Sequence, residues 1–300
     1  MSVLDRQKTV NTSVTRSGIG LHTARLVVIT IRPAPVNTGI VFYRSDLTGI
    51  DTAIPAHISN VSDVSLNTSI CNSDGAEIGT IEHLMAAFAG LGIDNAYVDV
   101  SGPELPAFDG SSDRYCQMIT EAGIKDQSED RRYIKVLKPI SVELNEAIST
   151  LTPSSVLHIS TKIDFSDPFI GASQYFYVHD DDSFMNELSA ARTFCLYKDV
   201  SQMRAAGYAI GGSLDNAIVV KDGQMLNETP LRFTDEFVRH KTLDCLGDLR
   251  LAGLGIIGHM TASRPGHRIN SELLKALFRN DSNYAIVTSK ECNDTEDKVA

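Results

Sequence analysis

Apolar and polar positions along the first 124 residues predict a small unit of strands and helices. Two apolar runs rich in strand-forming residues are separated by a turn containing proline and glycine, which predicts consecutive strands of a meander. Two later segments carry apolar residues at helical spacing, and Thr80 offers a side-chain cap to the first of them. The predicted elements are strands at 25–31, 39–43 and 95–100 and helices at 81–89 and 113–122.

The same order of elements recurs after residue 132. The charged stretch 125–132 has no apolar periodicity, and we expect an exposed connection there. Residues 197–220 are apolar with interspersed glycines and interrupt the second series where the first has nothing comparable, which is typical of a substrate-binding insertion. The predicted elements are strands at 133–142, 156–165 and 174–178, helices at 183–191 and 234–252, and then a strand and a helix capped by Asn270.

A repeated pentapeptide supports an internal duplication. Ala-Gly-Leu-Gly-Ile occurs at 89–93 and again at 252–256, each time between a predicted helix and a strand. Repeated architecture leaves such marks in a sequence. The pattern predicts an α+β protein of two similar α/β domains, at residues 1–124 and 133–290, followed by a tail at 291–300.

Composition excludes several classes of protein. The 300 residues are 42% hydrophobic, which is enough for one large or two medium cores. Apolar runs are far shorter than the roughly 20 residues that span a bilayer, and the N-terminus lacks the apolar region of a secretion signal. A net charge of −11 disfavours a nucleic-acid partner, which requires a basic surface. Five scattered cysteines without a Cys-x-x-Cys pair fit a reducing cytoplasm.

His240 and Asp244 are the first candidates for chemistry. Together with Asp248 they occupy positions i, i+4 and i+8 of a predicted helix and share one stripe of its surface. A histidine beside an acid on a helix is by itself more often a source of modest electrostatic stabilisation. The first half adds the adjacent Glu82 and His83, which point about 100° apart at a helix start. Two histidines and one carboxylate make a typical catalytic zinc set with an open position for water.

Two further groups suit acid–base catalysis. Glu82 is the natural general base beside that water, although a glutamate at a helix start is otherwise a surface acid favoured by the helix dipole. His267 lies in a Pro-Gly-His loop and can protonate a leaving amine if Asp248 keeps it charged; an ordinary loop histidine is the alternative. The other histidines are assigned to structure or surface, namely His22, His57, His158, His179 and His259.

A series of motifs resembles one enzyme family in chain order. The motifs are Ser17-Gly-Ile-Gly-Leu-His, Thr80-Ile-Glu-His-Leu, Ala89-Gly-Leu-Gly-Ile-Asp-Asn, Phe108-Asp-Gly-Ser, Ala191-Arg-Thr-Phe, residues 220–227, Asp235-Glu-Phe-Val-Arg-His-Lys and Pro265-Gly-His. Between about residues 6 and 288 they resemble the UDP-3-O-acyl-N-acetylglucosamine deacetylase (LpxC) family.

The resemblance implies a zinc-dependent deacetylase of lipid A biosynthesis. The implied reaction hydrolyses the acetamido group of UDP-3-O-(hydroxyacyl)-N-acetylglucosamine and releases acetate. The implied fold packs two similar domains, each with a small insert, as a sandwich with the active site between them. One catalytic Zn²⁺ is implied, with Fe²⁺ as the alternative in the cell. The implied partner is the acylated UDP-amino sugar, without nucleic acid or a transmembrane segment, and we expect a cytoplasmic monomer.

The family's catalytic groups can be carried over motif by motif. Most of them fall on the residues already chosen from their spacing on the predicted helices, and the resemblance adds Thr193, which would polarise the acetamide carbonyl. The others are the zinc ligands His83, His240 and Asp244, the general base Glu82, and the cationic His267 with Asp248 behind it.

The family also implies which positions contact the substrate. Sugar and nucleotide contacts fall on Phe194, Lys241, Phe165 and Arg264, and the walls of an acyl-chain passage on Leu21, Leu196, Val200, Met203, Ile210, Gly212 and Leu214. The chain departs from commoner family residues at Asn67, Ala147, Cys195 and Leu196, which bears on substrate and inhibitor affinity and not on the reaction.

Two other classes of function remain as alternatives. A zinc protease or another metal amidase is disfavoured because the chain has no His-Glu-x-x-His run. A catalytically inactive sugar-nucleotide or lipid-binding relative is disfavoured because the candidate catalytic residues are intact. An acetate-release assay with and without a chelator separates these alternatives.

Overall fold

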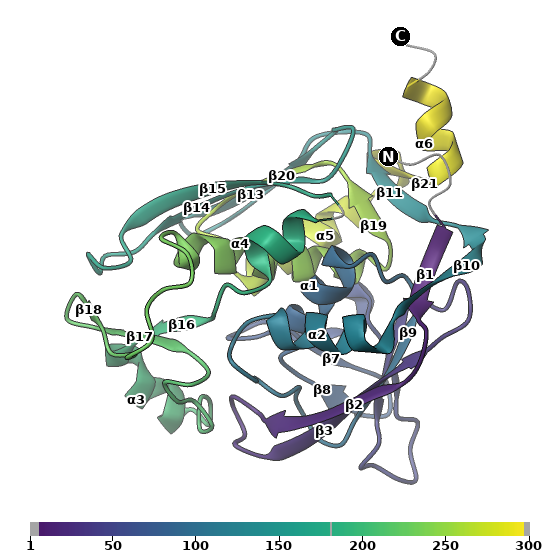
Figure 1. The fold of residues 1–300 in the computed structure, drawn as a ribbon. Coiled ribbons are helices and arrows are strands. Elements are labelled where there is room, and N and C mark those ends of the chain that lie inside the picture. The colour runs from purple at the N-terminus through teal and green to yellow at the C-terminus, as the bar shows by residue number, and fades with distance from the viewer. Residues whose placement is uncertain (1–5, 181, 297–300) are drawn as a thin grey trace.

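Two five-stranded sheets of the same construction form the frame of the protein (Figure 1). The computed structural model describes residues 6–180 and 182–296. The first sheet has the order β2 (Val14–Ile19), β3 (Leu26–Pro33), β9 (Ala96–Val100), β4 (Ile40–Arg44) and β5 (Ala53–Pro55). The second has the order β12 (Ile140–Leu144), β13 (Ala147–Thr152), β20 (His259–Ser263), β14 (His158–Asp164) and β15 (Ala172–Val178). In both sheets the third and fourth strands pair in parallel and all other neighbours antiparallel.

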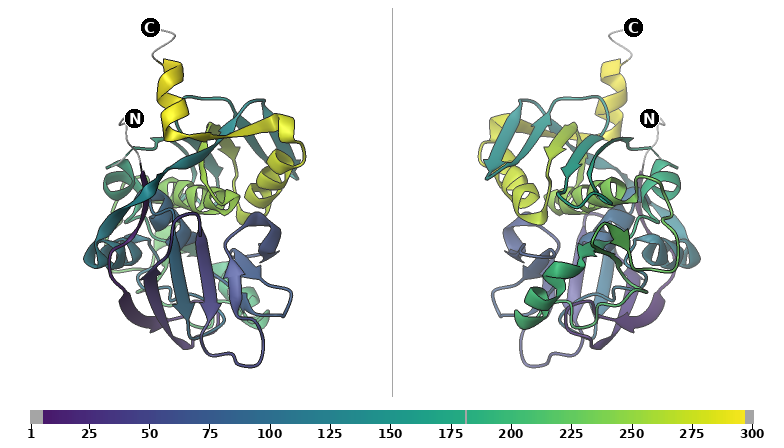
Figure 2. Two further views of the ribbon diagram at one scale, coloured as in Figure 1. Left: turned by 90° about the vertical axis from the view of Figure 1, so that its right-hand side faces the viewer. Right: turned by 90° about the vertical axis from the view of Figure 1, so that its left-hand side faces the viewer.

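Four of the helices lie between the two sheets (Figures 1 and 2). Helix α2 (Asp113–Ala122) packs on the first sheet, α4 (Glu236–Leu249) and α5 (His267–Phe278) pack on the second, and α1 (Glu82–Gly90) packs against α4. Apolar residues of both sheets and of these helices form one continuous core. The predicted α+β architecture of two similar units in a sandwich is confirmed.

Each half carries an insert at the same point of its topology, after the fourth of its five sheet strands in chain order: between β5 and α1 in the first half, and between β15 and α4 in the second. The insert of the first half is the small sheet β6 (Val61–Asp63), β7 (Ser69–Cys71) and β8 (Glu77–Ile78) after the turn η1 (Ile58–Asn60). That of the second half is β16 (Phe194–Leu196), α3 (Tyr197–Ala205), β17 (Ile218–Lys221) and β18 (Gln224–Met225) after η2 (Phe184–Leu188). The expectation from the sequence pattern that the first half has no comparable insert is wrong, whereas the small insert in each half that the family resemblance implies is present.

The segment predicted as an exposed connection is a strand. β10 (Ile124–Asp130) pairs antiparallel with β1 (Arg6–Val10), and its side chains are mostly exposed, so no apolar face marks it in the sequence. The predicted meander is also wrong, because β9 lies between β3 and β4. The predicted strand 133–142 is two strands, β11 (Arg132–Val136) and β12, separated by Pro139. β11 pairs with β19 (Gly255–Ile257) and β21 (Tyr284–Thr288).

Two predicted helix caps are absent from their positions. Thr80 has a positive φ of 58° and its hydroxyl accepts a hydrogen bond from Asn67, while Ile81 stands at the N-cap of α1. Asn270 lies inside α5, whose N-cap is Gly266. The pentapeptides also differ in backbone, since Gly92 has the positive φ in the first copy but Gly253 in the second. The evidence for a duplication is therefore the shared strand order of the two sheets, and not the repeated pentapeptide.

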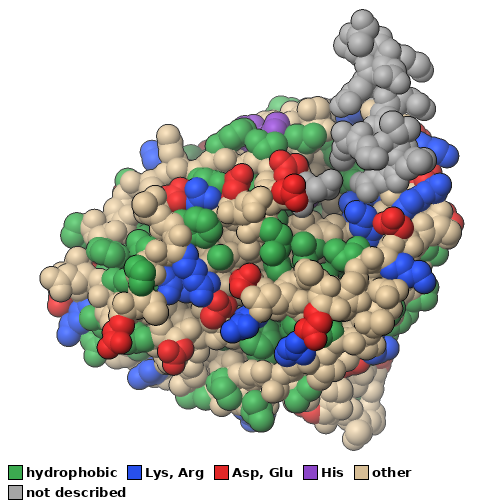
Figure 3. All heavy atoms as spheres, viewed as in Figure 1, with side chains coloured by type: hydrophobic (Ala, Val, Ile, Leu, Met, Phe, Trp, Pro, Cys, Tyr) green, Lys and Arg blue, Asp and Glu red, His purple; other side chains and the backbone are tan. Residues whose placement is uncertain are grey.

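The remaining short elements are η3 (Arg250–Ala252), η4 (Asp281–Asn283) and α6 (Ser289–Glu296). Helix α6 covers the beginning of the predicted tail, and residues 297–300 lie outside the described part. Over residues 6–180 and 182–296, no helix is both long and apolar enough to cross a membrane. On the face shown in Figure 3, acidic and basic side chains are interspersed without a large area of either sign.

Candidate active site

The contact between α1 and α4 brings together the three predicted metal ligands. His83 lies in the first turn of α1, and His240 and Asp244 are one turn apart on α4. The Nε2 atoms of His83 and His240 lie 3.6 and 3.4 Å from Oδ1 of Asp244. All three side chains are buried, and their ligand atoms lie within 4.8 Å of one another. In the described ranges this is the only group of three such side chains close enough to share one metal ion.

The protonation states of this group suit a cation. Nδ1 of His240 donates to the carbonyl oxygen of Ala191 at 3.1 Å, which leaves Nε2 as the free lone pair. Burial lowers the pKa of His240 to about 3, so the ring is neutral at pH 7. Burial acts to raise the pKa of Asp244, but His240 and the Lys241 ammonium outweigh it and hold that pKa well below its usual value.

One buried oxygen of Asp244 has no partner. Oδ2 accepts a hydrogen bond from Lys241 at 2.8 Å, whereas Oδ1 has no hydrogen-bond donor and is shielded from solvent. An unpaired buried carboxylate oxygen is costly unless a cation binds it. Because Oδ1 is also the atom nearest both imidazoles, the residues present fit a divalent metal ion.

A glycine lets the two helices approach closely enough to make this group. A Cβ atom on Gly247 of α4 would lie 2.1 Å from the backbone oxygen of Glu82 on α1. A glycine at this position therefore permits the first turn of α1, with Glu82 and His83, to rest directly on α4.

Glu82 and His267 face each other beside the metal ligands. Nε2 of His267 lies 3.9 Å from Oε1 of Glu82, and its Nδ1 lies 2.9 Å from Oδ2 of Asp248. Burial acts to lower the pKa of His267, but the carboxylates of Asp248 and Glu82 outweigh it and raise that pKa to about 9. The site therefore holds an imidazolium opposite a carboxylate at neutral pH.

Thr193 is placed in the site by a backbone contact between the halves. Its N–H donates to the carbonyl of Gly110 at 2.8 Å, and its own carbonyl accepts from Ile218 at 2.8 Å. Gly110 has a φ of +83°, and a Cβ atom there would lie 2.2 Å from the backbone oxygen of Asn216. Only glycine fits where the backbone of residue 110 passes this close to that of Asn216, and the Phe-Asp-Gly-Ser motif provides it.

A cavity of about 920 Å³ opens from the metal ligands toward the insert of the second half. Its wall includes most of the predicted site residues. They are Glu82, His83, Thr193, His240, Asp244 and His267 at the charged end, and Leu21, Phe194, Val200, Met203, Gly212, Leu214 and Lys241 elsewhere. Asp248 contacts this site through His267.

Four predicted substrate contacts lie outside the cavity wall. Phe165 and Leu196 pack against the small apolar core of the second half, while Cys195 and Tyr197 on either side of Leu196 line the cavity. Ile210 is 53% exposed to solvent. Arg264 pairs with Asp164, at 2.8 Å, and with Glu146 on the surface.

Two residues at or behind the cavity wall, His22 and Thr68, have no signal in the sequence. His22, assigned to structure or surface, is buried in the wall, where its Nδ1 accepts the N–H of Ala209 at 3.2 Å. Its acidic neighbour Glu104 is distant in the sequence and binds the N–H of His22 at 3.1 Å. Thr68, likewise unpredicted, donates to Asp248. Only contacts between distant segments identify these residues.

The four departures from commoner family residues fall in different settings. Asn67 is buried and donates to the hydroxyl of Thr80 at 2.9 Å, close to Glu82 along the chain. Cys195 lines the cavity, whereas Leu196 packs against the small apolar core of the second half. Ala147 begins β13 opposite Leu144. Two of the four, Asn67 and Cys195, therefore lie at or beside the candidate site.

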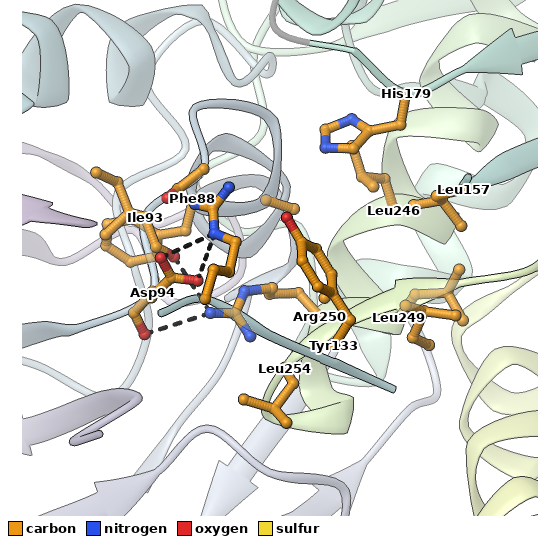
Figure 4. A pocket seen from close by; sticks show the side chains of 15 residues that line it. Phe88, Ile93, Asp94, Tyr133, Leu157, His179, Leu246, Leu249, Arg250 and Leu254 are labelled. Carbon is orange, nitrogen blue, oxygen red and sulfur yellow. Dashed lines mark hydrogen bonds and ion pairs between the residues drawn. The ribbon is translucent and has the colours of Figure 1, made fainter. Parts of the chain in front are cut away.

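A second cavity of about 60 Å³ lies between the halves (Figure 4). Arg250 extends beside it, and its Nη2 donates to the backbone oxygens of Ile93 and Asp94 at 3.2 and 3.3 Å. Nε of Arg131 lies 3.0 Å from the carboxylate of Asp94. The small volume and the internal pairing of its charges indicate a structural contact.

Comparison with known proteins agrees with these observations. A family model described as UDP-3-O-acyl N-acetylglycosamine deacetylase matches residues 7–279. Over 284 residues the chain is 42% identical to proteins called UDP-3-O-acyl-N-acetylglucosamine deacetylase from Shewanella sp. (strain W3-18-1), Shewanella oneidensis and Shewanella baltica (strain OS155). Each match covers 94% of this chain and 92% of the relative.

Proposed function

This chain belongs to the UDP-3-O-acyl-N-acetylglucosamine deacetylase (LpxC) family, and we infer that it hydrolyses the N-acetyl group of a UDP-3-O-acyl-N-acetylglucosamine in lipid A biosynthesis. The observation that carries this inference is the metal-ligand group, flanked by Glu82 and His267, at one end of a large cavity. Amide hydrolysis requires an activated water on one side and a proton donor for the amine on the other. The two flanking groups supply both functions.

We assign His83, His240 and Asp244 as the metal ligands and propose Zn²⁺ as the ion. When bound, such an ion lowers the pKa of a coordinated water and polarises a carbonyl oxygen. Two histidines and one carboxylate also suit Fe²⁺, so the ligand set alone does not select the metal. Anomalous scattering at the zinc and iron edges from the purified protein distinguishes the two.

Glu82 is the general base in the mechanism that we propose. It accepts a proton from the attacking water, the oxygen of which forms a bond to the acetyl carbon. His267 is held as an imidazolium by Asp248 and donates its Nε2 proton to the amide nitrogen as the C–N bond breaks. Thr193 lies in the wall beside these groups, where its hydroxyl stabilises the developing oxyanion. The products are acetate and the free amine of the sugar.

The rest of the cavity accounts for an acylated substrate. Leu214, Val200 and Met203 give its far part an apolar lining, which suits a hydrocarbon chain. Lys241 and Arg268 place positive charge near the metal ligands, which suits the diphosphate of a sugar nucleotide. We therefore propose that the sugar binds at the charged end and the acyl chain extends toward α3.

A pair of variants tests this function. Glu82→Gln removes the base and keeps the size of the side chain, so acetate release from the acylated UDP-sugar should fall at least about 100-fold while bound metal stays near one equivalent. His240→Ala removes a ligand, so both activity and metal content should fall. Lys275→Ala, on the exposed side of α5, is the control. An active Glu82→Gln variant, or full metal occupancy in His240→Ala, contradicts the assigned roles.

We also propose that the protein acts as a cytoplasmic monomer. Cys71, Cys116, Cys195 and Cys245 are free thiols, as expected in a reducing compartment. Both walls of the cavity come from one chain, so the site is complete without a second copy. Sedimentation equilibrium at micromolar concentration is the direct measurement, and a stable dimer would contradict the proposal.

A further inference from the structure

Thr68 contacts both the proposed base, Glu82, and Asp248, the carboxylate that supports the proposed acid, although it does not line the cavity. It lies in the insert of the first half, immediately before β7, and is only 2% exposed. Its hydroxyl donates to Oδ1 of Asp248 at 2.7 Å, and its backbone N–H donates to Oε2 of Glu82 at 3.0 Å. One residue therefore binds the proposed base and the carboxylate behind the proposed acid.

The hydrogen bonds to Asp248 divide between its two oxygens. Oδ2 accepts from Nδ1 of His267 and from Nδ2 of Asn270, each at 2.9 Å, and both donors belong to α5. Oδ1 accepts from Thr68, which comes from the opposite half of the molecule. The Thr68 hydroxyl thus fixes the rotation of the carboxylate, so that Oδ2 faces the imidazole.

Thr68 is itself anchored to the helix that carries the base. Its carbonyl oxygen accepts the N–H of Ile81, the N-cap residue of α1, at 3.2 Å. Its N–H and C=O therefore both bind the start of α1, and only its side chain crosses to α4. Any shift of α1 relative to α4 stretches the bond from Thr68 to Asp248.

We propose that Thr68 is a positioning residue that sets the placement of His267 relative to Glu82. The proposal rests on the proposed function, in which these two groups act on opposite sides of one amide bond. Catalysis of that kind is sensitive to misplacement, because a shift of about 1 Å can lower turnover about 100-fold. Thr68 acts through Asp248 and Glu82 and takes no proton itself.

The test compares variants of Thr68 that keep or remove the hydroxyl. Thr68→Val keeps the shape and the backbone N–H, and should lower kcat about 10- to 100-fold with KM within about twofold. Thr68→Ser restores the hydroxyl and should recover kcat to within about threefold of wild type. Thr161→Val is the matched control, because Thr161 is equally buried in β14 but its hydroxyl has no hydrogen-bond partner; its kcat should equal that of wild type.

A double-mutant cycle separates positioning from a general loss of structure. In an Asp248→Ala background the hydroxyl of Thr68 has no carboxylate to orient, so adding Thr68→Val should change kcat less than twofold. Thermal unfolding is recorded for every variant, and kinetics are measured well below the lowest Tm. If Thr68→Val does not fold, Thr68→Ala takes its place in the same cycle.

Three results overturn the proposal. The first is a Thr68→Val enzyme with kcat within twofold of wild type. The second is an equal loss of kcat on Thr68→Val with and without Asp248. The third is a failure of Thr68→Ser to restore kcat, which excludes a role for the hydroxyl. A wild-type protein that releases no acetate refutes the deacetylase function instead, so the two failures are distinguishable.

Discussion

At the scale of single residues, the charge on each group at the closed end of the cavity is set by its immediate partners. Asp248 and Glu82 keep His267 protonated against the effect of burial. Burial keeps His240 neutral a few ångströms away. In the mechanism that we propose, these two imidazoles have different tasks, one to donate a proton and the other to bind a cation.

His267 of the metal-free protein should titrate near pH 9. A histidine with a pKa raised in the folded state adds stability that is fully present below its unfolded pKa of about 6.5 and is lost as pH rises through the folded value. Metal-free protein should therefore lose stability between about pH 6.5 and 9. The ring can be followed by NMR of labelled histidine, with unfolding measured in urea across the same range.

Asp248→Asn provides the control for this titration. It removes the carboxylate that does most to raise the pKa of His267, so the midpoint should fall, and the loss of stability should become smaller and end at a lower pH. An unchanged midpoint in Asp248→Asn would show that Asp248 does not hold the charge on His267.

Sequence reasoning finds site residues when helix spacing or adjacency links them. His240, Asp244 and Asp248 follow from one helical stripe, and Glu82 and His83 from their adjacency at a helix start. Thr68 and His22 carry no such mark, because their partners Asp248 and Glu104 lie 180 and 82 positions away in the chain. Tertiary contacts alone place them.

At the scale of secondary-structure elements, the packing of α1 on α4 determines whether the metal ligands meet. His83 lies on α1, whereas His240 and Asp244 lie on α4. The separation of these side chains therefore depends on the distance between the two helix axes. Gly247 sets that distance, because the backbone of Glu82 occupies the place of a side chain.

Gly247→Ala should push the two helices apart. Its methyl group would overlap the Glu82 carbonyl, and overpacking of this kind costs about 1–3 kcal/mol of unfolding free energy. The shift moves His83 away from Asp244, so metal affinity should fall together with Tm. Calorimetry and metal titration with a competing chelator measure both, and Lys275→Ala on α5 should change neither. An unshifted Tm and unchanged metal affinity would contradict this account of the helix contact.

Elements with a buried face are predictable and fully exposed ones are not. The helix predicted at 113–122 matches α2 because its apolar residues fall on one face. The sequence predicts a connection where β10 lies. All side chains of this strand are exposed or half-exposed, so it has no buried apolar face that a sequence pattern could reveal. Identical residues, in turn, need not adopt the same structure. The two Ala-Gly-Leu-Gly-Ile segments have their positive φ at different glycines, Gly92 in the first and Gly253 in the second.

At the scale of the whole molecule, the two halves are joined by buried polar contacts as well as by the shared core. Arg250 of the second half reaches the backbone oxygens of Ile93 and Asp94 in the first half (Figure 4). Burial lowers the pKa of Arg250, which reflects the cost of placing its charge there. The hydrogen bonds to the carbonyl oxygens of Ile93 and Asp94 offset this cost.

Arg250→Met should weaken the junction of the halves. It leaves two buried carbonyl oxygens without this donor, so the free energy of unfolding should fall by about 1–3 kcal/mol, measured in urea. Arg16→Met is the matched control, because Arg16 pairs with Glu121 on the exposed surface and the loss there should be below about 1 kcal/mol. Equal losses in both variants would mean that the junction does not depend on Arg250.

The sequence pattern supports two whole-molecule features, the duplicated order of elements and the insert of the second half at 197–220, and it misses the insert of the first half. β6, β7 and β8 are only two or three residues each, too short for a periodicity to be recognised. Yet this insert contains Thr68, and the second contains the cavity wall. Short polar segments thus complete a site whose ligands were already predictable.

Helix α3 illustrates how such a site can diversify. None of its nine residues is buried, although one side of the helix lines the cavity. Substitutions on a helix without core contacts rarely change global stability by more than about 0.5 kcal/mol. Mutation can therefore widen or narrow this wall without unfolding the protein. If the acyl chain lies along α3, as we propose, such changes would alter the length of lipid that fits while the metal-ligand helices stay the same.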